Sequence, residues 1–108
     1  MRAAINIRDQ DLGIVRTILN ACLPTGAEVR VFGSRARGGG RRGSDLDLAV
    51  DAGRPLTRAE THALANAFEE SDLPYTVDVV DARSAAADFL ALIAEDWRSL
   101  PMPGANGD

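Results

Sequence analysis

Two aspartates stand two residues apart in a short apolar segment, and a third lies in a later segment of the same kind. Asp45 and Asp47 belong to DLDLAV at residues 45–50, and Asp78 belongs to YTVDVV at residues 75–80. Side chains two residues apart on a β-strand point to one side, so we expect the first two carboxylates on one face, roughly 7 Å apart at the backbone. Carboxylates this close repel each other unless a cation lies between them. Mg²⁺ binds one or two carboxylates together with the phosphate oxygens of a substrate.

The three carboxylates would converge if the two segments were neighbouring strands with matching faces. Such a group of acids is typical of two-metal phosphoryl or nucleotidyl transfer, in which the metal ions lie about 3.5–4 Å apart. Taken one at a time, the same residues have simpler interpretations, because an Asp-x-Asp pair also marks the solvent face of an edge strand. We interpret Asp51 and Asp81 as turn or strand-end residues.

Residues 33–44 form a glycine-rich stretch with four arginines, placed between an apolar strand and the first aspartate. Gly33 allows a close backbone approach to a ligand, and Ser34 offers a hydroxyl group to a phosphate. Successive backbone N–H groups in such a turn form a site for anions. The guanidinium groups of Arg35 and Arg37 suit phosphate oxygens. We therefore expect these four residues to form a phosphate cradle beside the metal-binding carboxylates.

Two other interpretations of this stretch stay open. Gly33 and Ser34 also fit a plain strand-to-helix turn. An Arg-Gly tract can bind RNA, but such tracts are repeated, disordered and usually interspersed with aromatic residues. This one occurs once and has no aromatic residue after Phe32, so we do not expect direct nucleic-acid binding. The formal net charge of −4 also argues against a polyanionic partner for the chain as a whole.

The elements that must position these residues follow from apolar spacing and from capping signals. We predict helices at residues 9–23, 57–70 and 85–99, and strands at residues 28–32, 45–50 and 75–80. Thr57 and Glu60 have the spacing of a capping box, and Ser84 is the predicted N-cap of the last helix. This order indicates an α/β (α+β) fold, a small mixed β-sheet flanked by helices. Three strands make a thin sheet, which leaves room for a fourth from an end of the chain or from a partner.

The 108 residues fit one small domain, which we place at residues 1–100, with a tail at residues 101–108 predicted to be disordered. Cys22 is the only cysteine, which excludes an internal disulfide. No segment approaches the ~20 apolar residues of a membrane span. The N-terminal residues lack the apolar core of a signal peptide. We therefore expect a cytoplasmic protein with no membrane partner.

Three segments together, GSRARG, SDLDLAV and VDVVD, resemble the minimal nucleotidyltransferases (MNT) of the DNA polymerase β superfamily, over residues 29–81. The resemblance implies a polymerase-β-like nucleotidyltransferase fold, with two Mg²⁺ ions as cofactors and ATP as the substrate. It implies that Gly33 and Ser34 contact the nucleotide phosphates and that Asp45 and Asp47 share the metal ions. Asp78 would be the third metal ligand and would favour deprotonation of the attacking hydroxyl group.

Small MNT proteins are commonly antitoxins encoded with an HEPN-domain ribonuclease toxin. The resemblance therefore implies a hetero-oligomer with such a toxin, and transfer of AMP to one of its side chains, typically a tyrosine. The alternative is a catalytically silent antitoxin that keeps the fold and blocks its partner sterically. The loop is richer in glycine and arginine than the resemblance suggests, which makes Arg41 and Arg42 candidates for partner contacts instead of nucleotide contacts.

Overall fold

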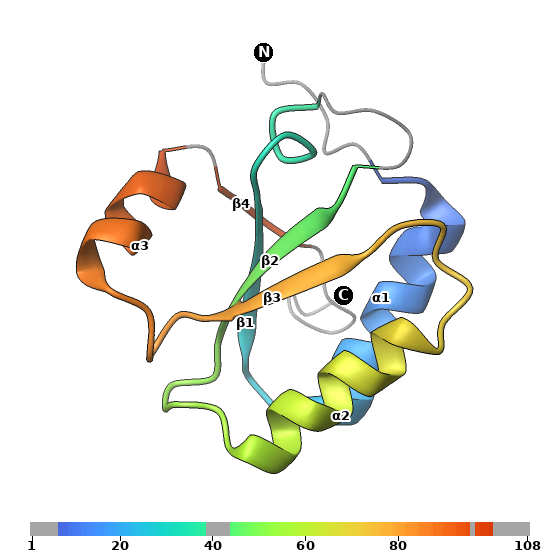
Figure 1. Cartoon of the computed structure of the whole chain (residues 1–108), viewed down its shortest axis with the longest axis horizontal. Helices are drawn as coiled ribbons and strands as arrows, with labels where there is room; N and C mark the ends of the chain where they lie inside the picture. Colours follow the sequence, from blue (N-terminus) through green and yellow to red (C-terminus); the bar gives the residue numbers. More distant parts are fainter. Residues whose placement is uncertain (1–6, 39–43, 96, 101–108) are drawn as a thin grey trace.

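The computed structural model describes residues 7–38, 44–95 and 97–100. Their elements are α1 (Asp9–Cys22), β1 (Glu28–Phe32), β2 (Leu46–Asp51), α2 (Arg58–Glu69), β3 (Val77–Asp81), α3 (Ala87–Ala94) and β4 (Arg98–Ser99). Helices α1 and α2 lie together on one side of the sheet, and α3 lies on the other (Figure 1). The expected small mixed sheet flanked by helices is confirmed. None of the helices in these ranges is long and apolar enough to cross a membrane.

The four strands form one sheet in the order β3-β2-β1-β4. Strand β1 runs antiparallel to both β2 and β4, whereas β2 and β3 are parallel. A parallel pair needs a crossover connection, and α2 supplies it. The end of β1, the start of β2 and the start of β3 consequently meet at one end of the sheet, where the glycine-rich loop begins.

The hydrophobic core lies between the sheet and the helix pair α1 and α2. It is built from alternate strand residues and one stripe of each helix, as period-two and 3.6-residue patterns predict. Its members include Val15, Leu19, Val29, Val31, Leu46, Leu48, Val50, Leu64 and Phe68. Because every second residue of β2 points into this core, the intervening side chains lie on the opposite face of the sheet.

A capping box starts α2, as its sequence predicts. The Thr57 hydroxyl accepts a hydrogen bond from the Glu60 N–H at 3.1 Å, and the Glu60 carboxylate accepts one from the Thr57 N–H at 2.8 Å. Arg54 adds two hydrogen bonds of 2.9 Å to the same carboxylate. This fixes the point at which the crossover helix begins, and so the way in which the chain returns to form β3.

The last helix and its start differ from the prediction. Helix α3 ends at Ala94 instead of residue 99, and its N-cap is Ala86, because the Ser84 hydroxyl donates to Asp81 at 2.8 Å instead. Residues 98–99 form β4, the fourth strand of the sheet, supplied by the C-terminal end of the described chain.

The edge of β1 explains why the helix stops early. Unpaired strand N–H and C=O groups need partners, and β4 satisfies part of this edge. The Leu100 N–H donates to the Val29 carbonyl at 2.8 Å, and the Arg30 guanidinium lies 4.2 Å from the ring centroid of Trp97. The predicted tail at residues 101–108 lies outside the described residues.

Candidate active site

Asp47 and Asp78 face each other across two neighbouring strands. They are register partners in the parallel pair of β2 and β3, so their side chains project from the same face of the sheet. Leu46 and Leu48, on either side of Asp47, are fully buried in the core, which places that face opposite to α1 and α2. Asp45 is exposed and immediately precedes β2.

The negative charges of both other carboxylates act on Asp47. Burial raises the pKa of Asp47, and the negative charges of Asp78 and Asp45 raise it further. This is the signature of acids that share one site, where a cation between them would relieve the repulsion.

The donor set fits a hard divalent cation. Carboxylate oxygens are ligands that Mg²⁺ accepts, with the remaining positions left to water and phosphate oxygens. Among the described residues, however, no three Asp, Glu, His or Cys side chains already stand in the arrangement of a metal site. Neighbouring strands lie only about 4.8 Å apart, so side-chain rotation is the change that Asp47 and Asp78 would need to share an ion.

Gly33 packs directly against Asp47. It follows β1, whose last residue, Phe32, is the register partner of Asp47 on the other neighbouring strand. The φ angle of Gly33 is +76°, and a β-carbon there would lie 2.5 Å from the Asp47 Oδ2 atom. Both facts require glycine. The chain then turns through hydrogen bonds from the Arg37 N–H to the Ser34 carbonyl at 3.2 Å and from the Gly38 N–H to the Arg35 carbonyl at 3.1 Å.

The two arginines expected at the nucleotide have different surroundings. Arg35 is only 4% exposed. Its Nε and Nη2 atoms donate to the Ser44 carbonyl at 3.0 and 2.8 Å, and its guanidinium carbon lies 4.0 Å from the ring centroid of Tyr75. Arg37 is exposed on the turn. Arg41 and Arg42, considered as partner contacts, lie outside the described residues.

A family profile described as "Nucleotidyltransferase domain" matches residues 12–99, a span that holds every site residue named above. The chain belongs to the nucleotidyltransferase domain family. This confirms the resemblance drawn from residues 29–81, and the fold and the enzyme class that it implied.

Individual relatives of this nucleotidyltransferase are similar over most of their length. "Probable protein adenylyltransferase MntA" of Haemophilus influenzae is 41% identical over 91 residues, which are 84% of this chain and 79% of that protein. A chain in the crystal structure of a toxin-antitoxin with AMP-PNP superimposes with a TM-score of 0.71 at 28% identity, covering 85% of this chain and 73% of its own. A chain in the complex of tri-AMPylated Shewanella oneidensis HEPN toxin with MNT antitoxin gives 0.67 at 23% identity, covering 89% and 73%, and so shows likeness of fold.

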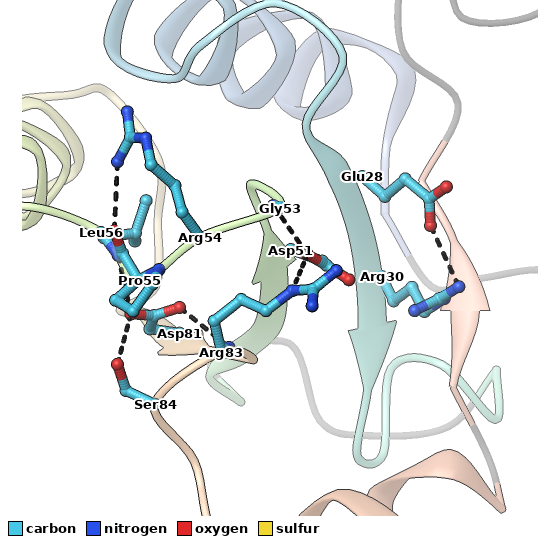
Figure 2. A network of polar contacts seen from close by, with 10 residues as sticks. All are labelled: Glu28, Arg30, Asp51, Gly53, Arg54, Pro55, Leu56, Asp81, Arg83 and Ser84. Atoms are coloured by element: carbon cyan, nitrogen blue, oxygen red, sulfur yellow. Dashed lines mark hydrogen bonds and ion pairs between the residues drawn. The ribbon is translucent and has the colours of Figure 1, made fainter.

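Two further aspartates of the nucleotidyltransferase stand at the other end of β2 and β3 (Figure 2). The Asp51 carboxylate accepts hydrogen bonds from the Arg83 side chain at 2.7 Å and from the Gly53 N–H at 2.8 Å, which lower its pKa. Burial alone would raise the pKa of Asp81, but hydrogen bonds, among them one of 2.9 Å from the Leu56 N–H, outweigh it. Both residues hold turns, as predicted, and neither belongs to the candidate site.

A cavity of about 260 Å³ lies between α2 and β3, on the helix side of the sheet. Its walls are mostly apolar, and Asp78 contributes to its lining together with Leu56, Thr61, Leu64, Ala65, Val77, Val79 and Asp81. A larger hollow of about 600 Å³ lies between α1 and the end of α2 and contains none of the site residues. Asp78 is part of the lining of the smaller cavity, but its carboxylate projects from the opposite face of the sheet, so we assign neither hollow to the candidate site.

The sequence did not predict the burial of Asp11 or the contacts of Tyr75 with Asp11 and Arg35. Asp11 is 2% exposed, and its Oδ2 atom accepts hydrogen bonds from the Tyr75 hydroxyl at 3.1 Å and from the Arg8 Nε at 3.2 Å. A signal was present, because Asp11 stands four and eight residues before Val15 and Leu19 and so lies in the buried stripe of its helix. A charged residue in such a stripe needs a partner in the fold.

Proposed function

We propose that this protein transfers AMP from ATP to a hydroxyl group of an HEPN-domain toxin and thereby acts as its antitoxin. One observation carries the chemistry: Asp47 and Asp78 are register partners on one sheet face, with Gly33 packed against Asp47. A relative named as a probable protein adenylyltransferase supports AMP as the transferred group. A similar structure of a toxin-antitoxin with AMP-PNP, an ATP analogue, supports the nucleotide and the kind of partner.

In this reaction the acceptor oxygen forms a bond to the α-phosphorus of ATP, the bond to the bridging oxygen breaks, and pyrophosphate leaves. Asp78 is exposed on the sheet face opposite to α1 and α2, where it can take the hydroxyl proton from an incoming acceptor. The backbone at Gly33 and Ser34, with Arg37, would bind the phosphates. Mg²⁺ ions held by Asp45, Asp47 and Asp78 would neutralise charge on the attacking and leaving oxygens.

The acceptor we propose is a tyrosine of the toxin, as the resemblance to the minimal nucleotidyltransferases implies. We also propose that the reaction takes place in the cytoplasm, where ATP and Mg²⁺ are both abundant.

The test is transfer of label from α-phosphate-labelled ATP to a co-expressed HEPN-type protein in the presence of Mg²⁺. We expect the toxin to gain the mass of an AMP group on tyrosine, and Asp47→Asn and Asp78→Asn to abolish the gain. Asp72→Asn is the matched control, since Asp72 is exposed and lines the hollow that lacks site residues. If the two site variants still neutralise the toxin as well as the wild type does, the protein is a silent antitoxin that acts by steric blocking.

A further inference from the structure

Arg35 is a buried residue of the glycine-rich segment that leads to the site. Its two hydrogen bonds to the Ser44 carbonyl hold the last loop residue before Asp45. The other end of the same loop is held by Gly33, which packs against Asp47. The two ends of the glycine-rich segment are therefore both attached at the acidic site, one by backbone contact and the other through a guanidinium group.

The aromatic ring of Tyr75 packs against the guanidinium group of Arg35. The guanidinium carbon of Arg35 lies 4.0 Å from the centroid of the Tyr75 ring, and the Tyr75 hydroxyl donates to Asp11 at 3.1 Å. Asp11 is in turn bound by Arg8 at 3.1 and 3.2 Å. This continuous set of contacts runs from the first turn of α1, through the residue that leads into β3, to the peptide that precedes Asp45.

Burial of these groups gives the contacts a defined geometry. Arg35 is 4% and Asp11 2% exposed, and among the described residues they are the buried charged side chains. A planar guanidinium group that stacks on a ring and binds one carbonyl with two N–H groups has little freedom to move. Displacement of reacting groups by about 1 Å can slow a reaction about a hundredfold. The rate of transfer would therefore depend on how firmly the Arg35 guanidinium group holds the Ser44 backbone next to Asp45.

We propose that Arg35, Tyr75 and Asp11 form a positioning network that sets the place of Asp45 relative to Asp47, a role that rests on the proposed nucleotidyl transfer. Arg35 then acts through the Ser44 backbone and not on the phosphates, which leaves Arg37 as the arginine of the GSRARG segment exposed at the cradle. Tyr75 is a positioning residue as well, and its hydroxyl group is committed to Asp11.

Substitutions separate this network from direct phosphate binding. Arg35→Lys keeps the charge but loses the stack and the two-pronged hydrogen bond. Tyr75→Leu removes the ring, and Tyr75→Phe keeps the ring while losing the bond to Asp11. Arg58→Lys, on the exposed start of α2, is the matched control. The network predicts that Arg35→Lys and Tyr75→Leu act alike, whereas a phosphate contact predicts that only Arg35 matters.

The first measurement is steady-state AMP transfer with calorimetric binding of AMP-PNP in Mg²⁺. We expect Arg35→Lys and Tyr75→Leu each to lower kcat about tenfold or more, with the double variant no slower than the slower single one, because coupled residues are non-additive. Tyr75→Phe, which keeps the ring but loses the bond to Asp11, should give a kcat between those of the wild type and Tyr75→Leu, and the AMP-PNP Kd should stay within about threefold throughout. A Tyr75→Leu protein with normal kcat, beside an Arg35→Lys protein with weakened AMP-PNP binding, would overturn the proposal in favour of a phosphate contact.

The second measurement does not depend on transfer. Backbone amide resonances of Asp45 and Asp47 are followed by NMR in the free protein and with Mg²⁺ alone. We expect Tyr75→Leu and Arg35→Lys to shift or broaden the Asp45 resonance and to leave that of Asp81 unchanged, with Arg58→Lys affecting neither. Unchanged Asp45 resonances would overturn the network, whereas a wild-type protein that fails to transfer AMP would count against the proposed function alone.

Discussion

Asp47 and Asp78 stand opposite each other on parallel strands, with no basic side chain contributing to the raised pKa of Asp47. Two carboxylates in this relation destabilise the protein that holds them. A cation bound between them would relieve this repulsion. The relation thus links the proposed catalytic role to a measurable effect on stability.

Asp47→Asn should abolish AMP transfer and raise the melting temperature of the free protein. The folded-state pKa of Asp47 lies above its ordinary value of 3.8, so its ionised form destabilises the fold at neutral pH, and this penalty fades as the pH falls toward that value. The gain should stay below about 1 kcal/mol, since water and salt screen a partly exposed carboxylate. Thermal melts at pH 7 and pH 4 would test the sign, and Mg²⁺ should stabilise the wild type more than the variant.

Gly33→Ala should remove activity because it fails on two independent grounds. The φ angle of +76° disfavours any L-residue by about 1–2 kcal/mol, and the new β-carbon would push the Asp47 carboxylate away. Gly26→Ala is the matched control, since its φ angle is +88° but a β-carbon added there would meet no heavy atom within 4 Å. Denaturant unfolding should show a backbone penalty in both variants, and AMP transfer should be lost in the Gly33 variant alone. Equal activity in the two would refute the close-packing argument.

The parts of the fold that depend on neighbouring residues were predictable from the sequence. The alternation of Leu46, Leu48 and Val50 with Asp47 follows from the strand period alone, and all three apolar residues are buried. The same holds for the capping box at Thr57. The prediction that Asp78 lies opposite Asp47 needed one further assumption, that the two strands are neighbours with matching faces, which the spacing of residues along the chain does not establish.

What could not be predicted depends on contacts between distant residues. An arginine in a glycine-rich loop suggests an exposed ligand contact. Only the fold brings the Tyr75 ring against the Arg35 guanidinium group and the Ser44 carbonyl within its hydrogen-bonding distance. Likewise, the apolar spacing that extended the last helix to residue 99 is local, whereas the demand of β1 for a partner at its edge is not. In both cases a tertiary contact overrode a local pattern.

Thr57→Ala should destabilise the protein by about 1 kcal/mol, the usual effect of losing an N-cap hydroxyl group. The hydroxyl accepts the Glu60 N–H at 3.1 Å and has no contact with the acidic site. AMP transfer at a temperature well below the melting point should therefore be unaffected, and Thr57→Ser should restore stability. A fall in kcat without a fall in stability would mean that α2 controls the position of β3 more directly than the packing suggests.

Tyr75 offers a direct optical test of the positioning network, because it is the only tyrosine in the chain. Burial, followed by the charge and the hydrogen bond of Asp11, raises its pKa from 10.0 to about 12. The folded protein therefore binds this proton more tightly than the unfolded chain does, so the phenol contributes full stability below pH 10 and loses it as the pH rises toward 12. Phenolate absorbance should titrate near 12 in the wild type and lower in Asp11→Asn, with Asp9→Asn unchanged. A midpoint near 10 in the folded wild type would mean that the Tyr75 hydroxyl is neither buried nor held by Asp11, and the network would lack the contact that joins α1 to Arg35.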